Sequence, residues 1–193
     1  MIRVRIYLLS FLLIGLVGVS NAQETFNSYE FGALTSKGFL ISHRKSLDLI
    51  RKDHTSGWEI FAEKRMPGTA YWHQKYRYPK IGVSGAYYYL GNSEELGNGY
   101  ALFIYIDFPF VSGEKLSYNL KVGQGLGWIE KPFEREENFK NLGISTHTNA
   151  FIHFNNHLEY KISNHLTGQL GVSFTHFSNG SSKTPNLGII IIE

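Results

Sequence analysis

Apolar and polar residues alternate in short segments along most of the chain. Between residues 99 and 110, Leu102, Ile104 and Ile106 share one parity, and Ala101 and Asp107 share the other. In an extended strand, residues i and i+2 point to the same side, so this pattern predicts a strand with one apolar face. Turn residues separate nine segments of this kind: 26–34, 38–43, 57–64, 80–90, 99–110, 116–128, 148–162, 166–178 and 187–192. One of the first two is expected to be a half-strand or a plug, which leaves eight strands.

The two faces of these segments favour a barrel. Gly123, Gly125 and Gly127 share one parity of segment 116–128, while the other parity is mostly apolar. Repeated glycines on one face suit the crowded inside of a small barrel. We therefore predict an all-β fold, an eight-stranded antiparallel transmembrane β-barrel. A soluble lipocalin-like barrel or sandwich would invert the two faces, and periodicity alone does not distinguish it.

The first 22 residues have the features of a signal peptide. Arg3 and Arg5 form a basic start, residues 6–19 are an apolar run, and Ser20-Asn21-Ala22 supplies small residues before a cleavage site at Gln23. The predicted organisation is a signal peptide over residues 1–22 and one barrel domain over residues 23–193. The export signal, with aromatic residues near the segment ends, favours a bacterial outer-membrane protein over a soluble one.

Composition narrows the classes of protein further. The chain has no cysteine, so it is neither a lipoprotein nor stabilised by disulfides. Its formal charge of +3 falls to about +1 when Arg3 and Arg5 leave with the signal, which removes support for a nucleic-acid partner. No apolar run of 18 residues follows the signal, so no helical membrane span is expected.

Two long connections are expected on the outside of the cell. Residues 67–79 are aromatic and basic, and residues 129–148 are long and charged. Outer-membrane barrels place long loops outside and short turns in the periplasm, so residues 92–98 and 163–164 are expected to be periplasmic turns. With both termini in the periplasm, residues 180–186, which follow the seventh strand, are expected outside.

A histidine and a serine end the segment 166–178 on its apolar face. His176 and Ser178 are two residues apart and share the parity of Leu170, Val172 and Phe174. A histidine can take the hydroxyl proton of a serine nucleophile, and the following Asn179 and the N–H groups of the Gly180-Ser181 turn can donate to an oxyanion. A hydrolytic pair on an apolar outer surface indicates a lipid substrate. The same H-x-S-N pattern also occurs in plain turn-capping sequences.

A wider set of motifs resembles a known family. The motifs are Phe174-Thr175-His176-Phe177-Ser178-Asn179-Gly180 with Pro185-Asn186-x-Gly188, Trp72-His73-Gln74-x-Tyr76-x-Tyr78-Pro79, Leu90-Gly91-Asn92, Leu96-Gly97-Asn98-x-Tyr100-Ala101-Leu102, Gly125-x-Gly127-Trp128 and Lys131-Pro132-Phe133. Together they resemble the lipid A 3-O-deacylase (PagL-type) family and its longer acyloxyacyl hydrolase-like relatives over most of residues 30–188.

The resemblance implies an outer-membrane serine esterase that removes an ester-linked acyl chain from lipid A in the outer leaflet. It assigns the catalytic histidine and serine to His176 and Ser178, and the oxyanion-linked asparagines to Asn179 and Asn186, with Gly180 beside them. Its partners are lipid A, or lipopolysaccharide, and the membrane; the oligomeric state is open. Within this resemblance, the aromatic residues 71–78 either lie at the membrane interface or contact the phosphates of lipid A.

The family's catalytic carboxylate has no clear counterpart. Its place falls near Ile190, and the one acid in that region is Glu193, whose opposite parity directs it to the other face of the strand. Either the catalytic acid is absent, or a strand shift or a frayed end lets Glu193 serve as the third catalytic residue beside His176 and Ser178. The chain also stops in mid-strand without the aromatic ending of such barrels, so a truncated product is expected. The alternative functions are a non-catalytic outer-membrane barrel with a structural or binding role and a soluble lipid-binding barrel of the periplasm.

No metal or cofactor is expected from the motifs. His153 and His157 are four residues apart on a strand, which separates them by more than about 12 Å, and His147 lies further away. The Gly123-x-Gly125-x-Gly127 pattern is not followed by a helix pattern, so it is no dinucleotide fingerprint.

Overall fold

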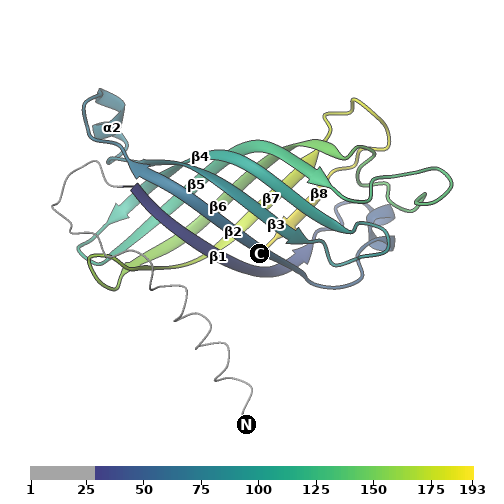
Figure 1. The fold of residues 1–193 in the computed structure, drawn as a ribbon, viewed down its shortest axis with the longest axis horizontal. Helices are drawn as coiled ribbons and strands as arrows, with labels where there is room; N and C mark the ends of the chain where they lie inside the picture. Colours follow the sequence, from purple (N-terminus) through teal and green to yellow (C-terminus); the bar gives the residue numbers. More distant parts are fainter. Residues whose placement is uncertain (1–28) are drawn as a thin grey trace, which may run out of the picture.

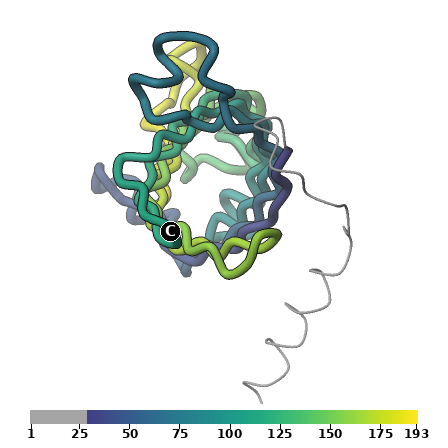
Figure 2. The backbone as a smooth tube through the Cα atoms, turned by 90° about the vertical axis from the view of Figure 1, so that its left-hand side faces the viewer, coloured from purple at the N-terminus to yellow at the C-terminus, as the bar shows by residue number. Residues whose placement is uncertain are grey.

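The computed structural model describes residues 29–193 and forms a closed antiparallel barrel of eight strands (Figure 1). The elements are β1 (Tyr29–Leu40), the 3-10 helix η1 (Lys45–Leu49), β2 (Thr55–Arg65), α2 (Tyr71–Lys75), β3 (Lys80–Tyr89), β4 (Asn98–Ser112), β5 (Leu116–Ile129), β6 (Thr148–Lys161), β7 (Thr167–Ser178) and β8 (Ile189–Ile192). Each strand pairs with the next, and β8 pairs with β1 to close the ring that Figure 2 shows. The predicted fold class is thus confirmed, while the predicted signal peptide lies outside the described residues.

The barrel turns its apolar face outward. On β4, Leu102 and Ile104 are each 63% exposed. The alternate residues Phe103 and Tyr105 point inward and are 2% and 3% exposed. The same alternation runs through β2, β3, β5 and β6 and through the last residues of β7. An apolar exterior around a partly polar interior is the arrangement of a membrane barrel, and a lipocalin-like barrel has the faces reversed. Among the described residues, neither short helix has the length and apolarity needed to cross a membrane.

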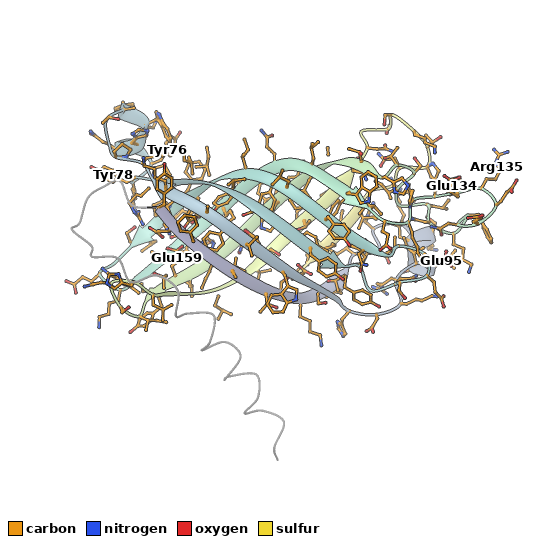
Figure 3. All side chains as sticks on the ribbon, in the orientation of Figure 1. Tyr76, Tyr78, Glu95, Glu134, Arg135 and Glu159 are labelled. Atoms are coloured by element: carbon orange, nitrogen blue, oxygen red, sulfur yellow. The ribbon has the colours of Figure 1, made fainter. Side chains whose placement is uncertain are left out.

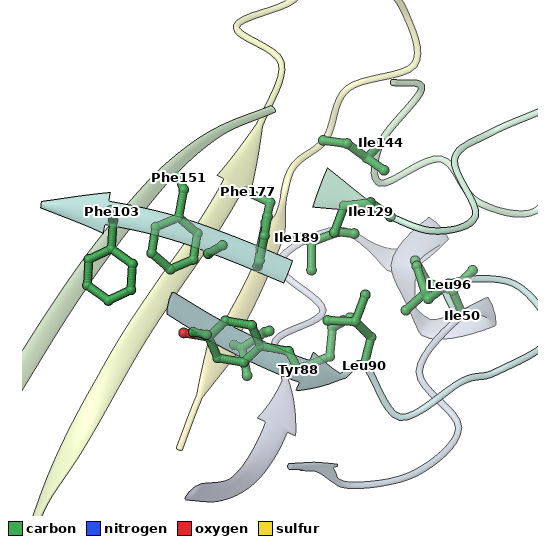
Figure 4. Close-up of a cluster of buried hydrophobic side chains, with 14 of the residues drawn as sticks. Ile50, Tyr88, Leu90, Leu96, Phe103, Ile129, Ile144, Phe151, Phe177 and Ile189 are labelled. Carbon is green, nitrogen blue, oxygen red and sulfur yellow. The ribbon is translucent and has the colours of Figure 1, made fainter. Parts of the chain in front are cut away.

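Side chains fill the inside of the barrel in layers. Phe103, Phe151 and Phe177 pack against one another with ring centroids 4.9 and 5.1 Å apart, and Tyr88 meets Phe177 edge-on (Figure 4). A Cβ atom at Gly127 would lie 2.5 Å from the Phe177 ring, so the expected glycine face does make room for core aromatic rings. Charged layers follow along the axis, beginning with the pair between Lys121 and Glu59, which are 3.0 Å apart.

The first and last strands differ in length. The two segments predicted at 26–34 and 38–43 form the single strand β1 within the described residues, and neither is a plug. Strand β8 has four residues and pairs with β1 only at Phe39 and Leu40. Figure 1 accordingly places the C-terminus partway along the wall. In the part of the chain that the structure describes, the rest of β1 therefore has no strand partner on its β8 side.

The connections alternate between the two ends of the barrel. Residues 41–54, 90–97, 130–147 and 179–188 lie at one end, here called the site end, and residues 66–79, 113–115 and 162–166 lie at the other, here called the far end. Figure 3 shows this separation, with Glu95, Glu134 and Arg135 at the site end and Tyr76 and Tyr78 at the far end.

This alternation corrects two predictions made from loop length. Residues 67–79 were expected on the same side as residues 129–148, and residues 92–98 on the opposite side, and both expectations are wrong. In an antiparallel barrel the parity of the preceding strand decides the end, whatever the length of the connection. The aromatic residues 71–78 therefore lie away from His176 and cannot contact a substrate bound there.

Candidate active site

His176 and Ser178 lie on the outer surface at the site end of β7. Both are half-buried and follow Leu170, Val172 and Phe174 along the apolar outer face. The strand register places His176 opposite Ile190 of β8 and Ser178 opposite Ala150 of β6. The sequence parity thus gave the correct face, and the two side chains project together toward the region that lipid would occupy.

The hydroxyl of Ser178 is held by two donors. The backbone N–H of Gly180 donates to Ser178 Oγ at 3.2 Å, and Asn186 Nδ2 donates to it at 3.1 Å. A hydroxyl has two acceptor lone pairs and one proton, so both lone pairs are occupied and the proton remains available for a base. In the described structure no hydrogen bond joins Ser178 to His176, which is common in substrate-free hydrolases.

Asn186 is oriented by the backbone of the preceding turn. The N–H of Asn179 donates to Asn186 Oδ1 at 3.2 Å, which directs the amide nitrogen of Asn186 toward Ser178. The side chain of Asn179 was predicted to donate to an oxyanion, but it donates elsewhere, to Ser145 Oγ at 3.1 Å and to the Lys183 carbonyl at 2.8 Å. Gly180 and Asn186 are therefore the donors that the structure brings to Ser178, and Asn179 supports them.

Two residues that the sequence motifs do not contain anchor this turn from other loops. Ser145, from the β5–β6 connection, donates to the Lys183 carbonyl at 2.8 Å and accepts from Asn179. His43, from the β1–β2 connection, bonds through Nε2 to the Leu187 carbonyl at 2.8 Å. Neither residue lies in a motif that signals chemistry, because its role comes only from the meeting of three connections at the site end.

The ring of His176 packs against a glycine. At Gly188, where φ is +82°, an added Cβ would lie 2.5 Å from His176 Cε1. The N–H of Gly188 also donates to the Gly143 carbonyl at 2.8 Å. Only glycine allows both the positive φ and the close approach of the His176 ring. This requirement accounts for Gly188 in the Pro185-Asn186-x-Gly188 motif.

The structure does not bring Glu193 to His176. Glu193 pairs through its backbone with Ser173 and turns its side chain into the barrel, where Oε2 accepts from Ser36 Oγ at 2.7 Å. Its inward direction follows from the parity that separates it from Ile190. Among the described residues no carboxylate hydrogen-bonds or ion-pairs with His176, and its buried Nδ1 has no hydrogen-bond partner. The doubtful assignment of Glu193 as the catalytic acid is not supported by this geometry.

The closed eight-stranded barrel with its apolar outer face fits an outer-membrane type of β-barrel. The family model for lipid A 3-O-deacylase (PagL) matches residues 57–192, and the chain belongs to this family. The family resemblance drawn from the sequence motifs is thereby confirmed. No curated protein and no solved structure matches the chain.

Proposed function

We propose that this protein is an outer-membrane serine esterase that removes an ester-linked acyl chain from lipid A, with Ser178 as nucleophile and His176 as general base. The observation that supports this most directly is the environment of Ser178 Oγ. Both of its lone pairs are engaged by Gly180 and Asn186, while its proton is free and His176 shares its face. The family match at the level of lipid A deacylation gives the substrate class.

The reaction follows from these groups. His176 takes the hydroxyl proton as Ser178 Oγ attacks the ester carbonyl carbon, and the carbonyl oxygen becomes an oxyanion. The Gly180 N–H and Asn186 Nδ2, which hold Oγ in the free protein, are placed to donate to that oxyanion. His176 then returns the proton to the departing lipid A hydroxyl. A water molecule, deprotonated by His176, hydrolyses the acyl-serine and releases a fatty acid.

The proposed mechanism uses a dyad in place of a triad. In a serine protease, replacing the acid that orients the histidine lowers kcat by about 10⁴-fold, yet activity above the uncatalysed rate remains. We therefore expect slow turnover. The ring of His176 is confined by Gly188, and this contact takes over part of the orienting role of an acid.

The test is mass spectrometry of lipid A from cells that express the wild type, Ser178→Ala or the control Ser182→Ala. Ser182 lies exposed on the same connection and its side chain takes no part in the proposed reaction. We expect acyl loss with the wild type and with Ser182→Ala, and a loss of at least about 10³-fold in rate for Ser178→Ala. Heat-modifiable migration on a gel verifies that each variant is folded.

A non-catalytic barrel is the second candidate function. The observation that favours it is the lack, among the described residues, of a carboxylate beside His176. Intact lipid A in cells that contain the folded wild-type protein would establish this candidate and reject the esterase.

A further inference from the structure

A second polar cluster lies inside the barrel near the far end. It consists of Asp107 on β4 and of His157 and Glu159 on β6. Asp107 and His157 are each 1% exposed, and Figure 3 shows Glu159 toward the end that carries Tyr76 and Tyr78. The ligand atoms of the three side chains all lie within 4.8 Å of one another. We propose that these three residues form a binding site for a divalent metal ion of the Zn²⁺ type.

The hydrogen bonding of His157 directs a lone pair into the cluster. His157 Nδ1 bonds to the Asn155 carbonyl at 3.3 Å, and since a carbonyl only accepts, Nδ1 carries the proton. In neutral imidazole, Nε2 then presents its lone pair to the carboxylates of Asp107 and Glu159. Three electron-rich atoms facing one another repel unless a proton on Nε2 or a metal cation lies between them. A histidine whose second nitrogen donates to a backbone carbonyl is the usual arrangement of a metal ligand.

The distances fit a metal better than a shared proton. His157 Nε2 lies 3.4 Å from Asp107 Oδ2 and 3.5 Å from Glu159 Oε1, and neither contact has hydrogen-bond geometry. Hydrogen bonds between an imidazolium and a carboxylate are shorter, about 2.7–2.9 Å. In contrast, ligands bound tetrahedrally to Zn²⁺ at about 2.0–2.1 Å lie roughly 3.3–3.4 Å apart. The ligand atoms therefore need only small adjustments to bind the ion.

The surroundings carry excess negative charge. Lys80 Nζ contacts three carboxylates, Glu30, Glu63 and Glu159, at 2.8–3.1 Å. Lys121 Nζ pairs with a further carboxylate, that of Glu59, at 3.0 Å. Asp107 lies opposite both lysines in the strand register, so five carboxylates face two lysines when His157 is neutral. Buried charges without compensation cost several kcal/mol each, so a divalent cation would stabilise this cluster.

The remaining contacts of the cluster are compatible with a bound ion. Lys80 Nζ lies 3.1 Å from Oε1 and 3.3 Å from Oε2 of Glu159, so a small shift of the lysine toward Oε2 leaves Oε1 to bind the metal. Asn119 Nδ2 donates to Asp107 Oδ2 at 3.2 Å and orients that carboxylate. The side chain of Glu159 is 15% exposed, which provides an entrance from the far end.

A metal at this position would connect strands that are not neighbours. Strand β5 lies between β4 and β6 in the barrel, so an ion held by Asp107 and by His157 and Glu159 bridges across β5 through the interior. The ion's role would be structural, and it is independent of the esterase proposal because the cluster lies toward the opposite end of the barrel from Ser178.

Calorimetric titration of the purified barrel, refolded in detergent and stripped with a chelator, tests the proposal with Zn²⁺ as the probe. We expect one Zn²⁺ per chain, a higher Tm with the ion bound, and binding weakened more than about 100-fold in Asp107→Asn and His157→Gln. The matched control is His153→Gln, since His153 is buried on the same face of β6 and bonds to Thr175 away from the cluster.

Two outcomes would overturn the site. One is the absence of Zn²⁺ binding to the wild type, which would leave His157 as a protonated ion-pair partner. The other is undiminished binding by both cluster variants, which would place the ion on surface histidines. If a cluster variant does not refold, zinc-edge X-ray absorption on the wild type decides: one nitrogen and two carboxylate ligands at about 2.0–2.1 Å support the site, and a shell of several imidazoles rejects it.

Discussion

At the scale of single residues, the site depends on the hydrogen bonds of the side-chain amide of Asn186. Its oxygen is held by the Asn179 N–H and its nitrogen by Ser178 Oγ, so the side chain has one orientation. The amide nitrogen of Asn186 is therefore oriented toward Ser178 before the substrate binds. Donors that need no reorganisation are the most effective stabilisers of a developing oxyanion.

Replacing Asn186 by Ala should lower kcat by about 10²–10³-fold, the usual cost of one oxyanion donor, with a smaller effect on KM. The measurement is the rate of fatty-acid release from purified lipid A in detergent. Asn164→Ala, on the exposed β6–β7 connection, is the control and should match the wild type. Equal losses in kcat for both variants would show that Asn186 has no part in stabilising the transition state.

At the scale of elements, the pairing of β7 with β8 decides what His176 meets. His176 lies opposite Ile190, and Phe174 lies opposite Ile192, both on the outer face. A carboxylate at position 190 would therefore stand beside the histidine ring, and one at position 192 would stand two residues along the strand.

Ile190→Glu should raise the rate of lipid A deacylation, because a carboxylate beside His176 orients the ring and stabilises the imidazolium. Removal of such an acid costs about 10⁴-fold elsewhere, so a gain of 10-fold or more is expected here. Ile192→Glu is the matched control, with the same residue type on the same strand and face, and should give no gain. Equal rates of lipid A deacylation for Ile190→Glu and Ile192→Glu would show that the lack of an acid beside His176 does not limit the reaction.

The strands were largely predictable, and their connections were not. Segment 116–128 was predicted within one residue of β5, because alternation and glycine parity are local properties of the sequence. The outward parity of His176 and Ser178 was correct for the same reason. The end at which residues 67–79 lie depends on the number of preceding strands, so treating β1 as two segments and judging by loop length gave the wrong end.

The candidate site was predictable only where its residues are close in sequence. Ser178, Gly180 and Asn186 belong to one turn, and the motif contains them all. Ser145 and His43 contact that turn from other connections, and no periodicity in the sequence indicates their role. The cluster of Asp107 and His157 cannot be recognised from histidine spacing, because it depends on the register across the three strands β4, β5 and β6.

At the scale of the whole molecule, the site end and the far end are chemically distinct surfaces. All connections that support Ser178 lie at the site end, and both the short turns and the aromatic helix α2 lie at the other. A lipid A deacylase in the outer membrane must present the site end to the outer leaflet.

Single cysteines test this orientation directly, since the chain contains none of its own. Ser182→Cys on the β7–β8 connection should react with a membrane-impermeant thiol reagent on whole cells. Asn164→Cys, at the far end, should react only after the cells are lysed. Labelling in the reverse order would mean that the barrel is inserted with the opposite orientation and would remove the site from lipid A.

The filled interior has an electrical consequence. Phenylalanine rings in tilted and edge-on contact cross the barrel below the site end, and the paired charges of Lys121 and Lys80 lie beyond them along the axis. An interior of eight strands offers just enough space for such side chains, so they occupy the room that an open pore would need. We therefore expect little ion conduction along the barrel axis, which single-channel recording in planar bilayers would measure.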